Sequence, residues 1–155
     1  MKKIIFGGIL LLCIGFTSCR TASISSYYQY ETECLGDQLD GSILLRVKGQ
    51  GISRNAAINA AEKQAVNDIM FSGVKRGQCT FVPLLKEVNA REKYRTYFES
   101  LFSGNDYDKY VRIAPRNKLK KVAMKDGTVG TTYLIVLKVF RTELEQKLIS
   151  DNIIK

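Results

Sequence analysis

The chain has 155 residues and a formal net charge of +9, a length that suits one compact domain and is short for two. The absence of histidine excludes Ser-His-Asp and Cys-His catalysis and removes the commonest zinc ligand. The excess of lysine and arginine favours acidic partners in general, without indicating nucleic acid.

The first residues have the pattern of a secretion signal. Lys2 and Lys3 precede an apolar run over residues 4–16, which is shorter than the ~20 residues needed to span a bilayer. The run ends in small polar residues followed by Cys19. This segment resembles the signal of bacterial lipoproteins, in which a cysteine after a box of small residues is lipidated and becomes the new N-terminus.

That resemblance implies a division of the chain into a signal peptide (residues 1–18), a lipidated tether (19–26) and one folded domain (27–155). Fatty acyl chains on Cys19 would anchor the domain, since each buried methylene contributes about 0.8 kcal/mol. Arg20 at the second mature position, in place of aspartate, implies the outer membrane and a position facing the periplasm. Two alternatives stay open, namely a secreted protein with an incidental Cys19 and an uncleaved membrane helix.

The first part of the domain predicts a β-hairpin. Apolar and polar residues alternate over residues 28–34, with Cys34 on the buried face, and again over residues 43–48. Residues 36–41 read as the turn between these strands, and residues 49–51 end the second one.

Two helices are expected next. Ser53 caps a helix over residues 54–72, whose alanines allow a close approach to a sheet and whose polar side, including Asp68, faces water. A second helix over residues 89–103 carries an aromatic stripe. We interpret this stripe first as core and second as an interface. Its members are Tyr94, Tyr97, Phe98, Leu101 and Phe102.

The remainder predicts a second hairpin and a terminal helix. Residues 110–114 are extended, residues 119–124 form a basic strand, and residues 131–140 form an apolar strand at the centre of the sheet. A helix then starts near Arg141 and ends before the C-terminus. The order β-β-α-α-β-β-α predicts an α+β fold in which two hairpins form a mostly antiparallel sheet packed with two or three helices.

Glycines followed by an alanine-rich helix carry a second resemblance. Residues 47–51 and 55–65 are similar to the Helicobacter-type LPP lipoproteins and to the N-terminal domain of a flagellar outer-ring assembly protein. The resemblance covers residues 42–74 and, more loosely, 131–140. It implies an envelope protein and brings no catalytic residue.

Cys34 and Cys79 are the two cysteines that remain after the signal and Cys19, and an oxidising compartment would allow them to pair. The alternative is that both are buried apolar residues that never meet, because sequence does not give the distance between them.

A basic cluster is the strongest charged feature. It is a candidate site for an acidic partner or an anion, together with Tyr94, Tyr97 and Phe98. The alternative is a charged edge strand that prevents aggregation between sheets. The cluster consists of Arg112, Arg116, Lys118, Lys120, Lys121 and Lys125.

The carboxylate pairs Glu31 with Glu33 and Asp106 with Asp108 read as solvated surface and not as a glycosidase or metal site. No cofactor, metal or catalytic residue is expected. The sequence therefore predicts a non-catalytic, lipid-anchored subunit or assembly factor of an envelope complex of the secretion, gliding or flagellar type. The alternative is a periplasmic binding module for a small ligand such as a lipid or a glycan fragment.

Overall fold

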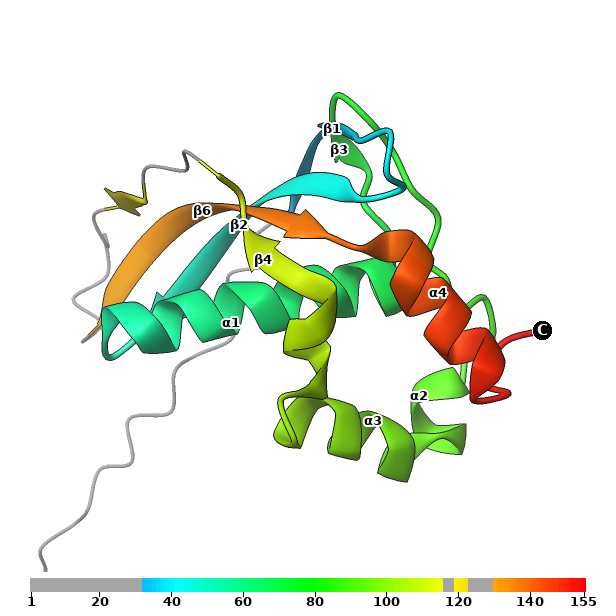
Figure 1. Cartoon of the computed structure of the whole chain (residues 1–155). Coiled ribbons are helices and arrows are strands. Elements are labelled where there is room, and N and C mark those ends of the chain that lie inside the picture. Colours follow the sequence, from blue (N-terminus) through cyan, green and yellow to red (C-terminus); the bar gives the residue numbers. More distant parts are fainter. Residues whose placement is uncertain (1–31, 116–118, 123–129) are drawn as a thin grey trace, which may run out of the picture.

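The computed structural model describes residues 32–115, 119–122 and 130–155. Within this part of the chain a curved six-stranded sheet lies on one long helix, and shorter helices gather beyond that helix and at one end of the sheet (Figure 1). The α+β class expected from the order of elements is confirmed.

The sheet has the order β3-β1-β2-β6-β4. All of its pairings are antiparallel except that of β1 with β3. Because β2 pairs along the whole of β6, strands β4 and β5 share the other edge of β6. The strands are β1 (Glu33–Asp37), β2 (Ile43–Gly51), β3 (Arg76–Gly77), β4 (Val111–Ile113), β5 (Lys120–Val122) and β6 (Thr131–Val139).

Two of the helices expected from the sequence, over residues 54–72 and 89–103, are interrupted in the structure. A π-helical segment (Asp68–Ser72) continues α1, and a 3₁₀ helix (Asp106–Tyr110) leads into β4. The α-helices are α1 (Arg54–Asn67), α2 (Ala90–Lys93), α3 (Arg95–Ser103) and α4 (Arg141–Ser150).

β6 lies at the centre of the sheet, as its apolar sequence predicted. Ile135, Leu137 and Val139 are fully buried on the face that meets α1. Leu134 and Val136 point to the opposite face and are half-buried. This difference between the two faces follows from the two-residue period of a strand.

α1 lies very close to β2 because small residues meet at the contact. The Ser53 side chain accepts a hydrogen bond of 3.2 Å from the Ala56 N–H and so caps the helix, as expected. A Cβ atom at Gly49 would overlap the backbone carbonyl of Ala57 and lie 2.8 Å from the Cβ of Ala61. Only glycine therefore fits at this point of β2.

Several boundaries differ from the prediction. β1 continues to Asp37, past the expected start of the turn at Gly36, through an irregularity in its pairing with β2. β2 continues to Gly51, since its last glycines pair with β6 while α1 crosses them. Residues 28–31 of the expected first strand and the expected turn at residues 125–127 lie outside the described residues.

The expected helix over residues 89–103 is interrupted at Tyr94, which has φ −112° and ψ 33°. β3 was not expected, because a two-residue strand carries no alternation that a sequence could display. The terminal helix α4 is confirmed, with Leu144 and Leu148 fully buried one turn apart.

Candidate functional site

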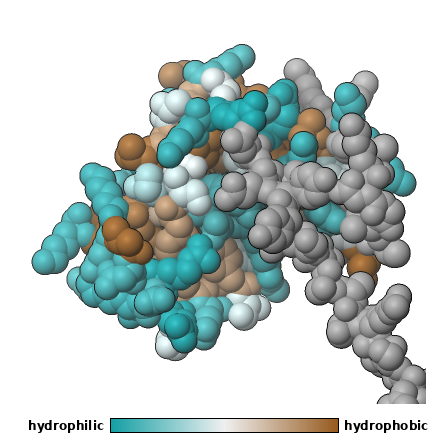
Figure 2. Space-filling view, turned by 180° about the vertical axis from the view of Figure 1, so that it is seen from behind, coloured by the Kyte–Doolittle hydropathy of each residue, from teal (hydrophilic) through white to brown (hydrophobic). Residues whose placement is uncertain are grey.

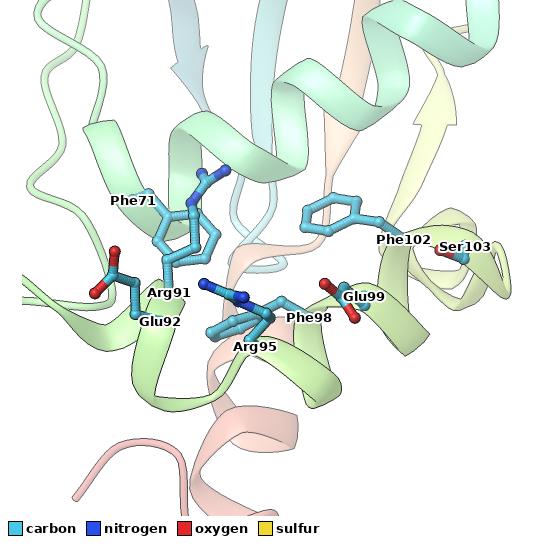
Figure 3. A pocket seen from close by; sticks show the side chains of 8 residues that line it. All are labelled: Phe71, Arg91, Glu92, Arg95, Phe98, Glu99, Phe102 and Ser103. Atoms are coloured by element: carbon cyan, nitrogen blue, oxygen red, sulfur yellow. The ribbon is translucent and has the colours of Figure 1, made fainter.

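A groove of about 460 Å³ lies between the end of α1 and the helices α2 and α3 (Figure 3). Its floor is aromatic and its rim is charged, and the exposed rim makes it a surface groove and not an enclosed cavity. The lining residues are Phe71, Arg91, Glu92, Arg95, Phe98, Glu99, Phe102 and Ser103.

Phe71 reaches the groove from the π-helical segment that follows α1. The carboxylate of Asp68 at the start of this segment is buried and accepts hydrogen bonds from the Thr32 hydroxyl and, at 2.7 Å, from the Gln64 side-chain amide. Burial raises the pKa of Asp68, and these hydrogen bonds oppose the increase. The prediction that Asp68 faces water is therefore wrong. π-Helical turns are rare and occur often at functional sites.

The aromatic stripe belongs largely to the core, which was the first of the two interpretations. Phe98 is 4% exposed and packs edge to face against Phe71, with the ring centres 4.9 Å apart. Tyr94 and Tyr97 are half-buried and also contact Phe98 edge to face. Phe98 thus forms the floor of the groove, and Phe102 widens that floor along α3.

Arg91 is held in place at one end of the groove. Its guanidinium lies 4.2 Å from the centre of the Phe71 ring and donates a 2.5 Å hydrogen bond to the Asn67 side-chain oxygen. Arginine above an aromatic ring is a favourable cation–π arrangement. The contact joins α2 to the end of α1 at this end of the groove.

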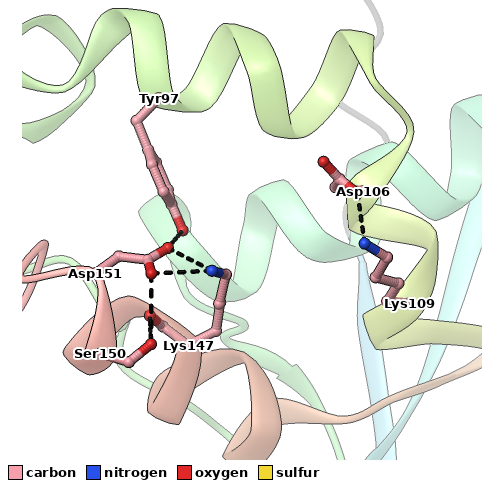
Figure 4. A network of polar contacts seen from close by, with 6 residues as sticks. All are labelled: Tyr97, Asp106, Lys109, Lys147, Ser150 and Asp151. Atoms are coloured by element: carbon pink, nitrogen blue, oxygen red, sulfur yellow. Dashed lines mark hydrogen bonds and ion pairs between the residues drawn. The ribbon is translucent and has the colours of Figure 1, made fainter.

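A second, smaller hollow of about 180 Å³ lies between α3, the 3₁₀ helix and α4. Tyr97 donates a 2.7 Å hydrogen bond to Asp151, which also pairs with Lys147 at 2.9 Å (Figure 4). Burial and the nearby Asp151 carboxylate raise the pKa of Tyr97, while the hydrogen bonds from Lys147 and Tyr97 lower that of Asp151. Asp151 thus pairs with groups from both helices, and the arrangement ties α3 to α4.

The basic cluster is described only in part. Arg116, Lys118 and Lys125 lie outside the described residues. Lys120 and Lys121 are exposed on β5. Arg112 is exposed on β4 and donates to the backbone carbonyls of Asp108 and Val111, the second at 2.8 Å. The two strands meet different parts of β6, and so Arg112 and the β5 lysines do not share one stretch of edge.

Cys34 and Cys79 form a disulfide in the structure, with their Cα atoms 5.3 Å apart. The bridge joins β1 to the loop after β3, where the two strands pair in parallel. The Asp37 carboxylate lies within 4.8 Å of both sulfur atoms. A cysteine binds a metal ion as the thiolate, which the two sulfur atoms of the disulfide cannot provide. Of these three residues, only Asp37 could then be a ligand.

Two of the carboxylates expected at the surface make ordinary ion pairs, and Asp108 is exposed. Glu33 pairs with Arg46 at 2.9 Å, and Asp106 pairs with Lys109 at 2.6 Å. Glu31 lies outside the described residues. Exposed pairs of this kind contribute about 0–1 kcal/mol each to stability, so they indicate no special chemistry.

The side of the molecule seen in Figure 2 is mostly hydrophilic outside the grey atoms, with hydrophobic residues in small separate groups. None of the helices in the described ranges is long and apolar enough to cross a bilayer. Cys19 and the expected signal and tether lie outside those ranges.

The groove was missed by the sequence analysis. Its floor combines Phe71 with Phe98 and Phe102, and Phe71 is far in the chain from the other two. Phe71 also belongs to a π-helical segment, which the sequence does not indicate. In the sequence, only the aromatic stripe from Tyr94 to Phe102 indicated this groove.

Comparisons with protein-family models, with curated proteins and with solved structures find no match for this chain.

Proposed function

We propose that this chain is a non-catalytic lipoprotein, anchored through Cys19 in the outer membrane and facing the periplasm, where it is a structural subunit or assembly factor of an envelope complex. The observation that carries the proposal is the N-terminal segment, in which two lysines, a short apolar run and small residues precede Cys19. The resemblance of residues 42–74 to envelope lipoproteins supports the same assignment.

The character of the groove favours a partner protein over a small ligand. Carriers of lipids or glycans usually enclose most of the ligand, whereas exposed charged residues line this groove. Aromatic and arginine side chains at a surface are also the residues that contribute most to protein interfaces.

A binding module for a small lipid or glycan fragment is the second candidate. It is favoured by the volume of the groove, about 460 Å³, which falls within the range of small-ligand sites. Mass spectrometry of the protein extracted under mild conditions separates the two candidates. A bound small molecule in stoichiometric amount supports the module, and stoichiometric envelope proteins support the subunit.

Replacement of Cys19 with alanine tests the anchor. We expect the Cys19→Ala variant to lose its acyl chains and to leave the membrane fraction, since position 19 then has no sulfur to be lipidated. The measurement is fractionation of cell envelopes with mass spectrometry of the N-terminal peptide.

Cys13→Ala is the matched control, because Cys13 lies within the signal and is removed with it. This variant should fractionate like the natural protein. Membrane association and acylation that persist in Cys19→Ala would rule out the lipoprotein assignment.

A further inference from the structure

One side of the groove is a ridge of polar side chains along α3. Arg95, Glu99 and Ser103 follow one another at intervals of four residues, which places them on one helix face about 6 Å apart. Arg91 precedes this series by four residues in α2. Figure 3 shows the two arginines at the Phe71 end of the groove, and Glu99 and Ser103 toward Phe102. Arg95 and Glu99 thus place a positive and a negative charge one turn apart on α3, and Glu92 lies beside Arg91 at the Phe71 end.

Arg95 differs from Arg91 in its contacts. The Arg91 guanidinium is engaged by Asn67 and Phe71. Among the residues that the structure describes, the Arg95 guanidinium has no hydrogen-bond or ion-pair partner, although it lines the groove. Glu99 lies one turn further along α3 and also has no such partner in the described ranges. These two opposite charges are available to a bound molecule.

The floor supplies the apolar part of the site. Phe71 and Phe102 are half-buried and Phe98 is almost fully buried. An apolar side chain that enters the groove would remove water from the two half-exposed rings, at about 25 cal/mol for each Å² of apolar surface buried.

We propose that this groove binds a segment of a partner protein that carries an acidic side chain at the Arg95 end, an apolar side chain over the phenylalanines, and a basic side chain at the Glu99 end. A peptide can present both charges at a fixed spacing, whereas an anionic lipid surface presents one sign and would be repelled by Glu99 and by Glu92 at the opposite end of the groove. The inference rests on the proposed function, for which it supplies the chemistry of the partner.

Selection from a random-peptide phage library against the purified full-length chain in detergent tests the groove. We expect enrichment of sequences in which an acidic, an apolar and a basic residue occur in a fixed order. Arg95→Glu should weaken the binding of an enriched peptide by about tenfold or more, because a like charge then faces the acidic residue.

Two further variants make the test specific. Arg54→Glu changes charge by the same amount at an exposed position at the start of α1, outside the groove, and should leave binding unchanged. The exchange of both charges, Arg95→Glu with Glu99→Arg, keeps the net charge and should select peptides with the acidic and basic residues in reverse order. Circular dichroism would verify that each variant is folded.

The proposal is overturned if no sequence is enriched, if the selected peptides bind Arg95→Glu as tightly as the natural chain, or if they carry one sign of charge only. Enrichment of peptides that match a segment of this chain would instead indicate that the groove is a contact between two copies of the chain. None of these results depends on acylation, so failure of the groove and failure of the Cys19 anchor are distinguishable.

Discussion

Asp68 shows how one buried side chain organises its surroundings. It accepts hydrogen bonds from Thr32 before β1 and from Gln64 on α1, and so ties the start of the sheet to the end of the helix. Its position at the start of the π-helical segment connects it to the groove, because Phe71 lies three residues later. An ionised carboxylate only accepts hydrogen bonds, and both the Thr32 hydroxyl and the Gln64 side-chain amide donate to it.

The buried position of Asp68 predicts a dependence of stability on pH. The folded state raises the pKa of Asp68 above its ordinary value of 3.8, so the folded protein binds the proton more tightly than the unfolded chain. Its contribution to the free energy of unfolding is therefore present at low pH and is lost as pH rises from about 3.8 through the raised pKa. Asp68→Asn should lack this loss, which urea unfolding at a series of pH values would measure.

Asp37→Asn is the control, since it removes the same charged group at the exposed end of β1, away from the hydrogen bonds of Asp68 with Thr32 and Gln64. If Asp68→Asn and the natural chain lost stability in parallel over this range, Asp68 would not be the group responsible.

At the scale of elements, the contact of α1 with β2 decides where the helical layer lies. Ala57, Ala61 and Ala65 are fully buried against the sheet, and Gly49 provides the space that they need. The alanine pattern predicted this close approach correctly. The breaks in the helices were not predictable, because both accompany contacts between distant residues. The π-helical segment starts at Asp68, which bonds Thr32, and the break at Tyr94 accompanies packing around Phe98.

The close approach predicts that Gly49→Ala destabilises the protein. The added methyl group would overlap the backbone of α1, so the helix or the strand must shift. Overpacking of this kind costs about 1–3 kcal/mol. Urea unfolding would measure the loss.

Leu39→Ala is the comparison, because Leu39 is fully exposed in the turn between β1 and β2 and its truncation should change stability by less than about 0.5 kcal/mol. Equal stability of Gly49→Ala and the natural chain would show that α1 does not lie as close as the structure places it.

At the scale of the whole molecule, the disulfide secures the edge of the sheet. The sequence separation between Cys34 and Cys79 is 45 residues, a span that contains β2, α1 and the π-helical segment. The short strand β3 pairs with β1 beside the bridge. The disulfide thus holds an edge that two paired residues alone would secure weakly.

Replacement of both cysteines by serine should lower the free energy of unfolding by about 2–4 kcal/mol, because the unfolded chain is no longer restrained by the closed loop. Thermal or urea unfolding of the double variant, with and without a reductant, is the measurement. A reductant should destabilise the natural chain and leave the Cys34→Ser, Cys79→Ser variant unchanged. A natural chain that is insensitive to reductant would argue against the bridge.

The sequence by itself determined the α+β class, the capped helix at Ser53, the central strand β6 and the terminal helix, because each rests on a local pattern of apolar residues or caps. It also supplied the prediction of a lipidated Cys19. Only the tertiary structure decided that Cys34 meets Cys79, that Asp68 is buried, and that Phe71 joins Phe98 and Phe102 around a groove. These features join residues that are distant in the chain, and local periodicity carries no information about which distant residues meet.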